Sequence, residues 1–461
     1  MRGAIAAGHP LTAEVGARTL EDGGNAVDAC VAAGFASWVA ESPLTGPGGG
    51  GFMLVHTGRD DRTRVLDFFV SVPSGPRGEP EEVSIAFDES TTQFFRVGPE
   101  TCAVPGMAAG LEAAHHSYGS LPWRRLVEPA IELARAGLDV TEAQAFLHVI
   151  LAPVLANTPA GGLVAGKRLE WSDLADMLEK IARRGAAAIY RGEIARRIAA
   201  TVPAIRRADL EHYRVIRRRP VRAPYRGHEF LSNPPPSSGG VLIALGLRRL
   251  EQPGRYGSAA AVRRLAETME AQARARERRL TRRLAEVGGT THISVADAAG
   301  NAASLSASTG GGGSGVVVPG TGIHLNNMLG EYDLMVGTPR PGERLTSMMA
   351  PSLVLDGANP RLVVGSAGSN RLRGAIMQIV VNVLGHAMDV ANGIAAPRVH
   401  LEEDVLHLEP PLDAGRVPYT IVRWRDKNLY FGGAAAVETL PDGSLAAAGD
   451  PRRGGVGLVV E

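Results

Sequence analysis

Residues 288–309 read GGTTHISVADAAGNAASLSAST, and this stretch decides the class of fold. Residues 290–297 alternate polar and apolar side chains, which is the period of a half-buried strand. Residues 298–301 predict a turn and residues 302–309 predict a returning strand, so the stretch forms a β-hairpin. Its first strand begins with a threonine behind two flexible glycines, a start that suits a new N-terminus.

Thr290 is therefore a candidate nucleophile. In an N-terminal threonine the hydroxyl is the nucleophile and the α-amine of the same residue is the base. A general base works best when its pKa lies near the working pH, and an α-amine has a pKa of about 7.7–8. A lysine has a pKa of about 10.4, which would have to be lowered strongly before it could act as the base. The amine exists only after the bond between Gly289 and Thr290 is cut. Judged on spacing alone, a strand that begins Gly-Gly-Thr-Thr is usually only a strand.

The remaining pattern mixes helices and strands, with antiparallel hairpins in the C-terminal part. That mixture favours a layered α/β or α+β architecture. Residues 75–95 are polar and are interpreted as loop. The expected helices cover residues 11–22, 26–39 with Asn25 as the cap, 123–136, and 370–386 with Asn370 as the cap. The expected strands cover residues 52–57, 64–72, 353–357, 361–366, 405–408 and 419–424.

Composition and charge exclude several classes of protein. The chain has 461 residues, of which 44% are hydrophobic and 21% charged, so it is not a disordered chain. Lys and Arg number 49 against 48 Asp and Glu, a net charge of +1 that calls for neither nucleic acid nor an acidic membrane. An arginine-rich segment at residues 263–283 carries interspersed glutamates, and we interpret it as a solvated helix face.

Cysteine, histidine and hydropathy patterns give no sign of a metal, a disulfide framework or a membrane span. Cys30 and Cys102 have no metal-ligand spacing, and the twelve histidines form no evident metal set. We expect no metal and no cofactor. Neither a signal peptide nor a transmembrane segment is evident, which predicts a cytoplasmic protein, or a periplasmic or secreted one if a signal was removed.

Three glycine-containing segments are candidate anion-binding sites: residues 45–51, 310–313 and 365–370. The first two lack the lysine of a phosphate loop. The third runs from a strand into a helix N-terminus, where free N–H groups favour a developing oxyanion. An ordinary strand-to-helix turn is the alternative. The sequence has no Gly-x-Ser-x-Gly elbow, so a hydrolase of that type is not indicated.

Several motifs, in this order, resemble the γ-glutamyltranspeptidase family, also called glutathione hydrolases. The resemblance covers nearly the whole chain. Its motifs are GHPLTAEVGARTLEDGGNAVDACVAA (8–33), TGPGGGGFMLV (45–55), AVPGMAAGLEAAHHSYGSLPW (103–123), NPPPSSGGV (233–241), GGTTHISVADAAGN (288–301) and VVGSAGSNR (363–371).

The resemblance implies an N-terminal-nucleophile hydrolase with a four-layer αββα sandwich. A precursor of this type cuts itself between Gly289 and Thr290 into a large portion, residues 1–289, and a small portion, residues 290–461. The two stay associated as a heterodimer and together form one αββα unit. Thr290 is then both the processing residue and the catalytic residue. Gly368 and Ser369 stand where the family, usually with Gly-Gly, donates backbone N–H groups to the oxyanion.

Several positions depart from the family pattern around the substrate. Phe69 stands where the family has an arginine that binds the α-carboxylate of the γ-glutamyl group. Met328 stands where a polar side chain helps to hold the α-amino group, and Gly310 replaces an asparagine that contacts the substrate. Three other substrate-binding positions also differ from the family. Ser308 replaces a threonine, Glu331 replaces an aspartate, and Thr346 with Ser347 replaces a pair of serines.

These departures predict a kept nucleophile with an altered acyl specificity. The expected substrate is a small-molecule amide, γ-glutamyl or glutaryl-like, and the acceptor is water or an amine. Thr291 and Ser308 are expected to orient the nucleophile, and His292 to pack beside the strand end. Arg371 or Arg373 is a candidate for a substitute cation. The alternative is an unprocessed, non-catalytic member of the family that acts as a binding or structural protein.

Overall fold

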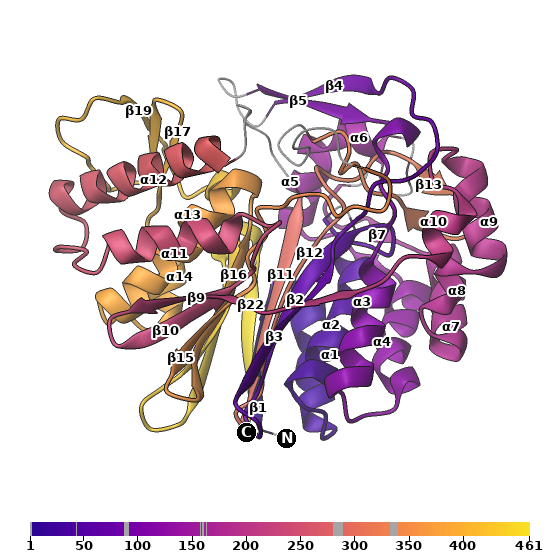
Figure 1. Ribbon diagram of the computed structural model, residues 1–461, viewed down its shortest axis with the longest axis horizontal. Helices are drawn as coiled ribbons and strands as arrows, with labels where there is room; N and C mark the ends of the chain where they lie inside the picture. The colour runs from indigo at the N-terminus through magenta and orange to yellow at the C-terminus, as the bar shows by residue number, and fades with distance from the viewer. Residues whose placement is uncertain are drawn as a thin grey trace.

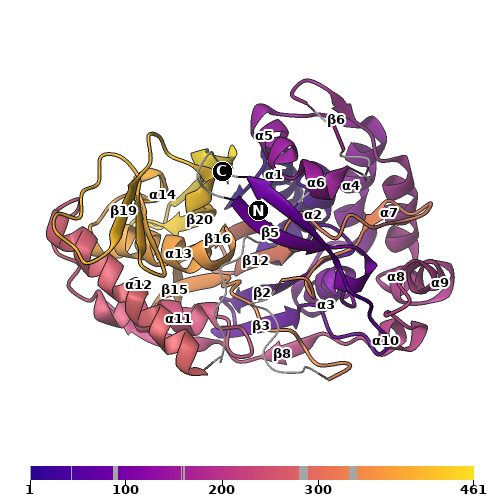
Figure 2. The same cartoon turned by 90° about the horizontal axis from the view of Figure 1, so that it is seen from above.

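The computed structural model describes residues 2–42, 44–86, 92–156, 158, 161–162, 164–279, 289–331 and 340–461. Over these residues two large antiparallel sheets lie face to face, and helices cover the outer side of each (Figures 1 and 2). The expected layered fold, in the order αββα, is confirmed.

The first sheet contains the hairpin that residues 290–309 predict. Its strand order is β22-β1-β11-β12-β2-β3-β8. Strands β11 and β12 lie in its middle and form the predicted hairpin, with Thr290 opposite Ser308. The bounds are β1 (Gly3–Ala7), β2 (Gly50–Thr57), β3 (Arg62–Phe68), β8 (Ile216–Arg218), β11 (Thr290–Asp297), β12 (Ala302–Ser308) and β22 (Val456–Val460).

The second sheet has the order β21-β20-β16-β15-β10-β9. It includes the predicted hairpin of β15 and β16, which a β-bulge after Val354 makes irregular. The bounds are β9 (Val221–Tyr225), β10 (His228–Ser232), β15 (Ser352–Asp356), β16 (Asn359–Ala367), β20 (Gly433–Thr439) and β21 (Leu445–Gly449). Both sheets therefore combine strands from before and after residue 289.

Residues of the first sheet alternate between two apolar layers. Met53 and Val55 of β2 pack into the layer with the helices, whereas Phe52 and Leu54 pack between the sheets. Both faces are buried, so the strands are apolar on both sides. The same alternation directs Thr290 and His292 of β11 into the space between the sheets, and Thr291 toward the helices.

Helices α1 (Pro10–Glu21) and α2 (Ala26–Ala40) lie on the first sheet, with α3 (Met107–Tyr118) and α4 (Trp123–Ala136) beside them. Helix α2 begins at Asn25 with the predicted cap, whose side chain accepts from the N–H groups of Val27 and Asp28. Every residue of α2 is buried, which explains its continuous apolar sequence. Further helices on this side are α5 (Glu142–Ile150), α6 (Ala152–Leu155), α7 (Ser172–Arg184), α8 (Ala187–Tyr190), α9 (Gly192–Thr201) and α10 (Arg207–Glu211).

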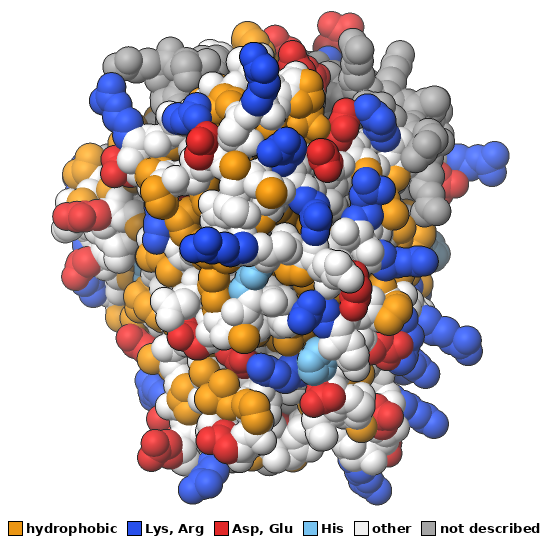
Figure 3. Space-filling model, turned by 90° about the vertical axis from the view of Figure 1, so that its left-hand side faces the viewer, with side chains coloured by type: hydrophobic (Ala, Val, Ile, Leu, Met, Phe, Trp, Pro, Cys, Tyr) orange, Lys and Arg blue, Asp and Glu red, His pale blue; other side chains and the backbone are white. Residues whose placement is uncertain are grey.

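The second sheet is covered by α11 (Gly239–Arg249), α13 (Leu372–Val380) and α14 (Val390–Ala395), with α12 (Ala259–Arg279) outside α11. On this face of the molecule, basic side chains are scattered with acidic ones between them (Figure 3). Arg274 of α12 pairs with Glu270 at 2.6 Å, and Arg276 donates to Asn370 at 3.0 Å. These contacts agree with a solvated face for the described part of the arginine-rich segment. Residues 280–283 of that segment lie outside the described residues.

Two expectations about elements were wrong. Residues 75–95 are not all loop, because β4 (Glu81–Ala86) and β5 (Thr92–Val97) pair as a hairpin, and Ile85 and Phe95 are buried beneath it. The helix expected from residue 370 begins at Leu372, after a 3-10 turn at Ser369–Arg371, and ends in a π-helical turn at Val381–Gly385. Asn370 is not its cap; the Asn370 side chain instead accepts the hydrogen bond from Arg276.

None of the helices formed by the described residues has both the length and the apolar character needed to cross a membrane.

Candidate active site

Thr290 lies at the first position of β11, at the end of the space between the two sheets, and is 3% exposed. In the uncut chain, the nitrogen of Thr290 belongs to the peptide bond with Gly289. Ser308, the cross-strand partner of Thr290, donates its hydroxyl to the carbonyl oxygen of Gly289 and accepts the N–H of Gly310 at 2.9 Å. The carbonyl that precedes the candidate nucleophile is thus held by a hydroxyl donor.

The sequence-predicted substrate residues gather around Thr290. Ser308 of β12, Ser369 of the 3-10 turn and residues from three loops line a small cavity next to it. The predicted residues in this lining are Phe69, Ser308, Met328, Glu331, Ser347 and Ser369. Thr346 is adjacent to Ser347 and partly buried, but does not line the cavity. The loop at residues 233–238 holds Ser347 in place, since Ser237 Oγ and Ser238 N donate to its carbonyl at 2.9 and 2.8 Å.

This small cavity has both apolar and polar walls and a volume of about 30 Å³. Phe69 is 1% exposed and stacks on Phe52 with 5.4 Å between ring centroids. Met328, Met348, Met349 and Leu372 form much of the remaining wall. A side chain at Gly310 would collide with the Asn327 amide, which explains why an asparagine does not fit there. Neither Arg371 nor Arg373 lines the cavity.

The turn after β16 contains the two residues that are predicted to donate N–H groups to the oxyanion. Gly368 has φ +118° and Ser369 has φ +51°, so both residues adopt left-handed conformations. A Cβ at residue 368 would also approach Gly432 Cα to 2.9 Å. The serine therefore takes a conformation that glycine adopts more readily, at a position where the family usually has glycine.

Thr291 points away from this small cavity. Its hydroxyl donates to Glu41 at the end of α2, and Thr12 of α1 donates to the other carboxylate oxygen at 2.9 Å. Burial raises the pKa of Glu41, although both hydrogen bonds lower it. Thr291 thus anchors β11 to the helix layer, and its contact with the nucleophile is through the backbone.

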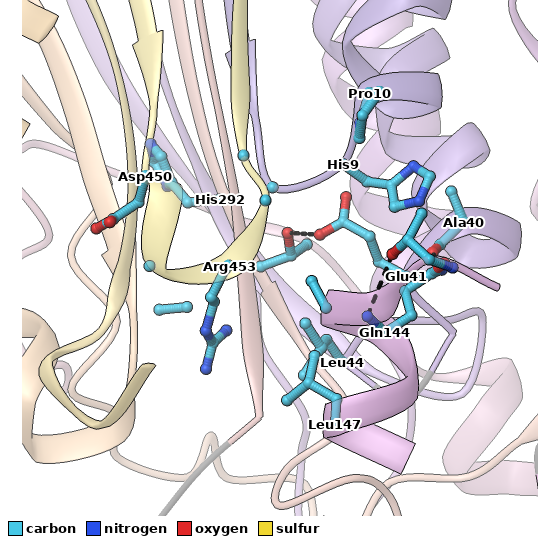
Figure 4. A pocket seen from close by; sticks show the side chains of 18 of the residues that line it. His9, Pro10, Ala40, Glu41, Leu44, Gln144, Leu147, His292, Asp450 and Arg453 are labelled. Atoms are coloured by element: carbon cyan, nitrogen blue, oxygen red, sulfur yellow. Dashed lines mark hydrogen bonds between the residues drawn. The ribbon is translucent and has the colours of Figure 1, made fainter. Parts of the chain in front are cut away.

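A second and larger cavity lies on the other side of Thr290, with a volume of about 420 Å³. It lies between the ends of β1, β11 and β22, the end of α2, and α5 (Figure 4). Arg453 of the 3-10 turn at Pro451–Arg453 lines it and donates from Nη1 to the carbonyl of Thr290 at 3.0 Å. A Cβ at residue 433 would overlap Arg453 Cδ, so Gly433 provides the room for this side chain.

Sequence reasoning missed Arg453 and Glu41. Both are far from Thr290 in the chain, and each approaches it only because a different element ends beside β11. Arg453 belongs to a turn held by an ionic cluster: Arg452 pairs with Glu409 and, at 3.1 Å, with Asp450, which also binds Arg398 at 2.7 Å. No local pattern in the sequence indicates that this turn lies beside the candidate nucleophile.

His292 is a packing residue. It is 2% exposed, and its ring nitrogens contact the hydroxyls of Ser306 at 2.8 Å and Ser294 at 3.0 Å. The ring rests on Gly365 of the second sheet, where a Cβ would overlap it. Burial lowers the pKa of His292 to about 3, so the ring is neutral at neutral pH. Among the described residues, no group of three or more His, Cys, Asp or Glu is arranged to hold a metal.

An αββα sandwich with a threonine at the head of a central strand defines an N-terminal-nucleophile hydrolase fold. The chain matches the model of the γ-glutamyltranspeptidase family over residues 12–286 and 281–460, and it belongs to that family.

Named relatives include acylases and glutathione hydrolases. The chain is 33% identical to the acylase ACY 1 proenzyme of Pseudomonas sp. strain SE83, covering 100% of this chain and 94% of the relative. It is 32% identical to the glutathione hydrolase proenzyme of Pseudomonas aeruginosa, covering 100% and 95%. The cephalosporin acylase from Bacillus halodurans shares the fold, with a TM-score of 0.84 at 24% identity over 100% of this chain and 96% of that one.

Proposed function

We propose that this protein cuts its own chain between Gly289 and Thr290 and then cleaves amides through an acyl ester on Thr290. The observation that carries the proposal is the hydrogen bond from Ser308 to the carbonyl of Gly289. This bond polarises the carbonyl whose attack frees the Thr290 amine. Membership of the family supports the proposal, as do the names of the two relatives, both of which are proenzymes.

In the cleavage, Thr290 Oγ attacks the carbonyl carbon of Gly289. The C–N bond breaks, the nitrogen takes up the hydroxyl proton, and water hydrolyses the resulting ester. The products are residues 1–289 with a free carboxylate and residues 290–461 with a free amine. Alternation of their strands in both sheets favours a stable heterodimer.

In turnover, the freed α-amine takes the proton of Thr290 Oγ while the oxygen attacks the substrate carbonyl. The N–H groups of Gly368 and Ser369 stabilise the negative oxygen. The substrate C–N bond then breaks and the leaving amine takes the proton. Water or a second amine attacks the acyl ester, which gives an acid or a new amide and restores the threonine.

The acyl group differs from the γ-glutamyl group in this proposal. Phe69 and Met328 are apolar where the family holds an α-carboxylate and an α-amine. Each charged hydrogen bond that is lost costs about 1.5–3 kcal/mol, so two losses weaken γ-glutamyl recognition by orders of magnitude. The preferred substrate is an amide whose acyl group lacks the α-amino acid end.

Intact mass spectrometry of the purified protein tests the cleavage. We expect two fragments that break between Gly289 and Thr290, and a single uncut chain of 48.4 kDa for Thr290→Ala. Cleaved protein is then assayed with γ-glutamyl and glutaryl anilides, which differ only in the α-amino group. An uncut wild-type chain after long incubation would contradict the proposal and favour a binding or structural role.

A further inference from the structure

The turn that carries the two predicted oxyanion donors has a backbone that depends on its surroundings. Gly368 has φ +118° and Ser369 has φ +51°, both in the left-handed region that glycine adopts more readily. A left-handed serine is costly, and such a residue persists only where the surrounding structure fixes it. The contacts that fix this turn therefore decide the direction of the Ser369 N–H.

Arg371, two residues after Ser369, holds the turn from its C-terminal side. Arg371 is 3% exposed, and its guanidinium lies over the ring of Tyr430, 4.5 Å from the ring centroid. Tyr430 belongs to the 3-10 turn at Leu429–Phe431 and stacks on Trp424, with 4.8 Å between ring centroids. The end of the oxyanion turn thus rests on a buried aromatic cluster.

A second contact comes from a helix on the other side of the predicted cut. Asn370, 5% exposed, follows Ser369 directly, and its Oδ1 accepts a hydrogen bond from Arg276 Nη1 at 3.0 Å. Arg276 lies on α12, in the portion of the chain before Gly289. Helix α12 is itself held, because it packs on α11 and on β17 (Val399–Glu402) (Figure 1). The first portion of the chain therefore reaches a turn that belongs to the second portion.

We propose that Arg276 is a positioning residue for the oxyanion turn, which acts through Asn370 to keep the N–H of Ser369 aimed at the developing negative oxygen. The inference rests on the proposed function, because that oxygen belongs to a substrate carbonyl attacked by Thr290. The donor acts mainly when charge develops, so displacing it slows the chemical step and leaves substrate binding nearly unchanged. Neither Arg276 nor Asn370 lines the two cavities beside Thr290, which agrees with a role through Ser369.

Anilide hydrolysis by the cleaved protein tests this role through the split between kcat and KM. The substrate is the glutaryl or the γ-glutamyl anilide, whichever the wild-type protein hydrolyses faster. We expect Arg276→Ala to lower kcat by roughly 10- to 100-fold, the effect of a small misplacement of a catalytic group, with KM nearly unchanged. Arg276→Lys should retain part of the rate, because its ammonium can still donate to Asn370. A rise in KM with an unchanged kcat would overturn the proposal.

A double variant shows whether Arg276 acts through Asn370. Asn370→Ala should lower kcat as Arg276→Ala does, since both changes remove the same hydrogen bond. The two changes together should be no slower than either alone, because the second finds the contact already lost. Effects that multiply would mean that the two residues act independently, against the proposal.

Arg274→Ala is the matched control on the same helix. Arg274 is exposed and pairs with Glu270 at 2.6 Å, so its removal should leave kcat at the wild-type value. A fall in kcat as large as that of Arg276→Ala would show that any change to α12 disturbs the turn, and the specific role of Arg276 would be rejected.

Self-cleavage separates this inference from the proposed function. The carbonyl of Gly289 is held by Ser308 and not by the oxyanion turn, so Arg276→Ala should cut its own chain at close to the wild-type rate. Slow cutting together with slow turnover would give Arg276 a structural role instead. A wild-type chain that is never cut contradicts the proposed function, whereas a cut Arg276→Ala protein with the wild-type kcat contradicts the positioning role alone.

Discussion

Ser308 and Ser304 lie four residues apart on the same face of β12 and have different hydrogen-bond partners. Ser308 holds the carbonyl of Gly289, whereas Ser304 accepts the N–H of Ser352 at 3.1 Å and lies near His292. We expect Ser308→Ala to slow chain cleavage by about 10²–10³-fold, the usual effect of removing one donor to a developing oxyanion. The measurement is the rate at which the 48.4 kDa chain disappears.

Ser304→Ala is the control for this experiment, because it removes a buried hydroxyl without touching Gly289. It should be cleaved at close to the wild-type rate, with a modest loss of stability. Equal rates for Ser308→Ala and wild type would show that the Ser308 contact has no part in the cleavage.

The residues that line the small cavity could be predicted from the sequence, because several of them are positions at which this chain departs from the family's motifs. Phe69, Met328 and Ser347 each stand at a fixed place in a family pattern, and the fold brings all three to Thr290. Arg453 and Glu41 have no such pattern. Arg453 and Glu41 approach Thr290 because a turn and a helix that are distant in sequence end beside β11. The spacing of residues along the sequence does not show where those two elements end in space.

In the turn at Gly368 and Ser369, two neighbouring substitutions are expected to have different effects on stability. Gly368→Ala places a Cβ at φ +118° and against Gly432, so we expect a loss of about 1–3 kcal/mol in the free energy of unfolding. Ser369→Gly relieves a left-handed serine and keeps the N–H donor. It should be neutral or slightly stabilising and should retain activity.

Urea unfolding and anilide hydrolysis measure these two effects. Destabilisation by Ser369→Gly together with lost activity would mean that the serine side chain itself is required, against an oxyanion role carried by the backbone alone.

The elements that the sequence failed to predict have physical reasons. Glu82 and Ser84 make one face of β4 polar, and Glu81 adds a charge to the face of Val83 and Ile85, so this short alternating segment was interpreted as loop. The helix after β16 starts late because Gly368 and Ser369 are left-handed, and a left-handed turn delays the first helical residue. The central hairpin was predicted correctly because both of its strands and its turn carry strong local signals.

At the scale of the whole molecule, buried neutral histidines couple stability to pH. Burial lowers the pKa of His292 to about 3 and that of His324 to about 4, and lowers those of His9, His56, His148 and His400 as well. An unfolded histidine has a pKa of about 6.5 and binds a proton below it, whereas these folded ones do not. Stability is therefore present above pH 6.5 and is lost as the pH falls below it.

We expect the free energy of unfolding to be smaller at pH 5 than at pH 7.5. His292 alone contributes about 2 kcal/mol to that difference, because pH 5 is 1.5 units below the unfolded pKa. Urea unfolding of His292→Gln should show a smaller difference, and the exposed His116→Gln should behave like the wild type. Equal stability at both pH values would contradict neutral burial of these rings.

The pairing of β1 with β22 places Gly3 opposite Val460, so the first and last strands run side by side and the chain ends meet (Figure 1). Adjacent strands are about 4.8 Å apart, a gap that a few glycines bridge. Circular permutation can therefore join the old ends and open the chain between Gly289 and Thr290. Such a polypeptide would begin its translated sequence at the threonine. Its amine would come from ribosomal synthesis and removal of the initiator methionine, and acyl transfer could then be studied apart from self-cleavage.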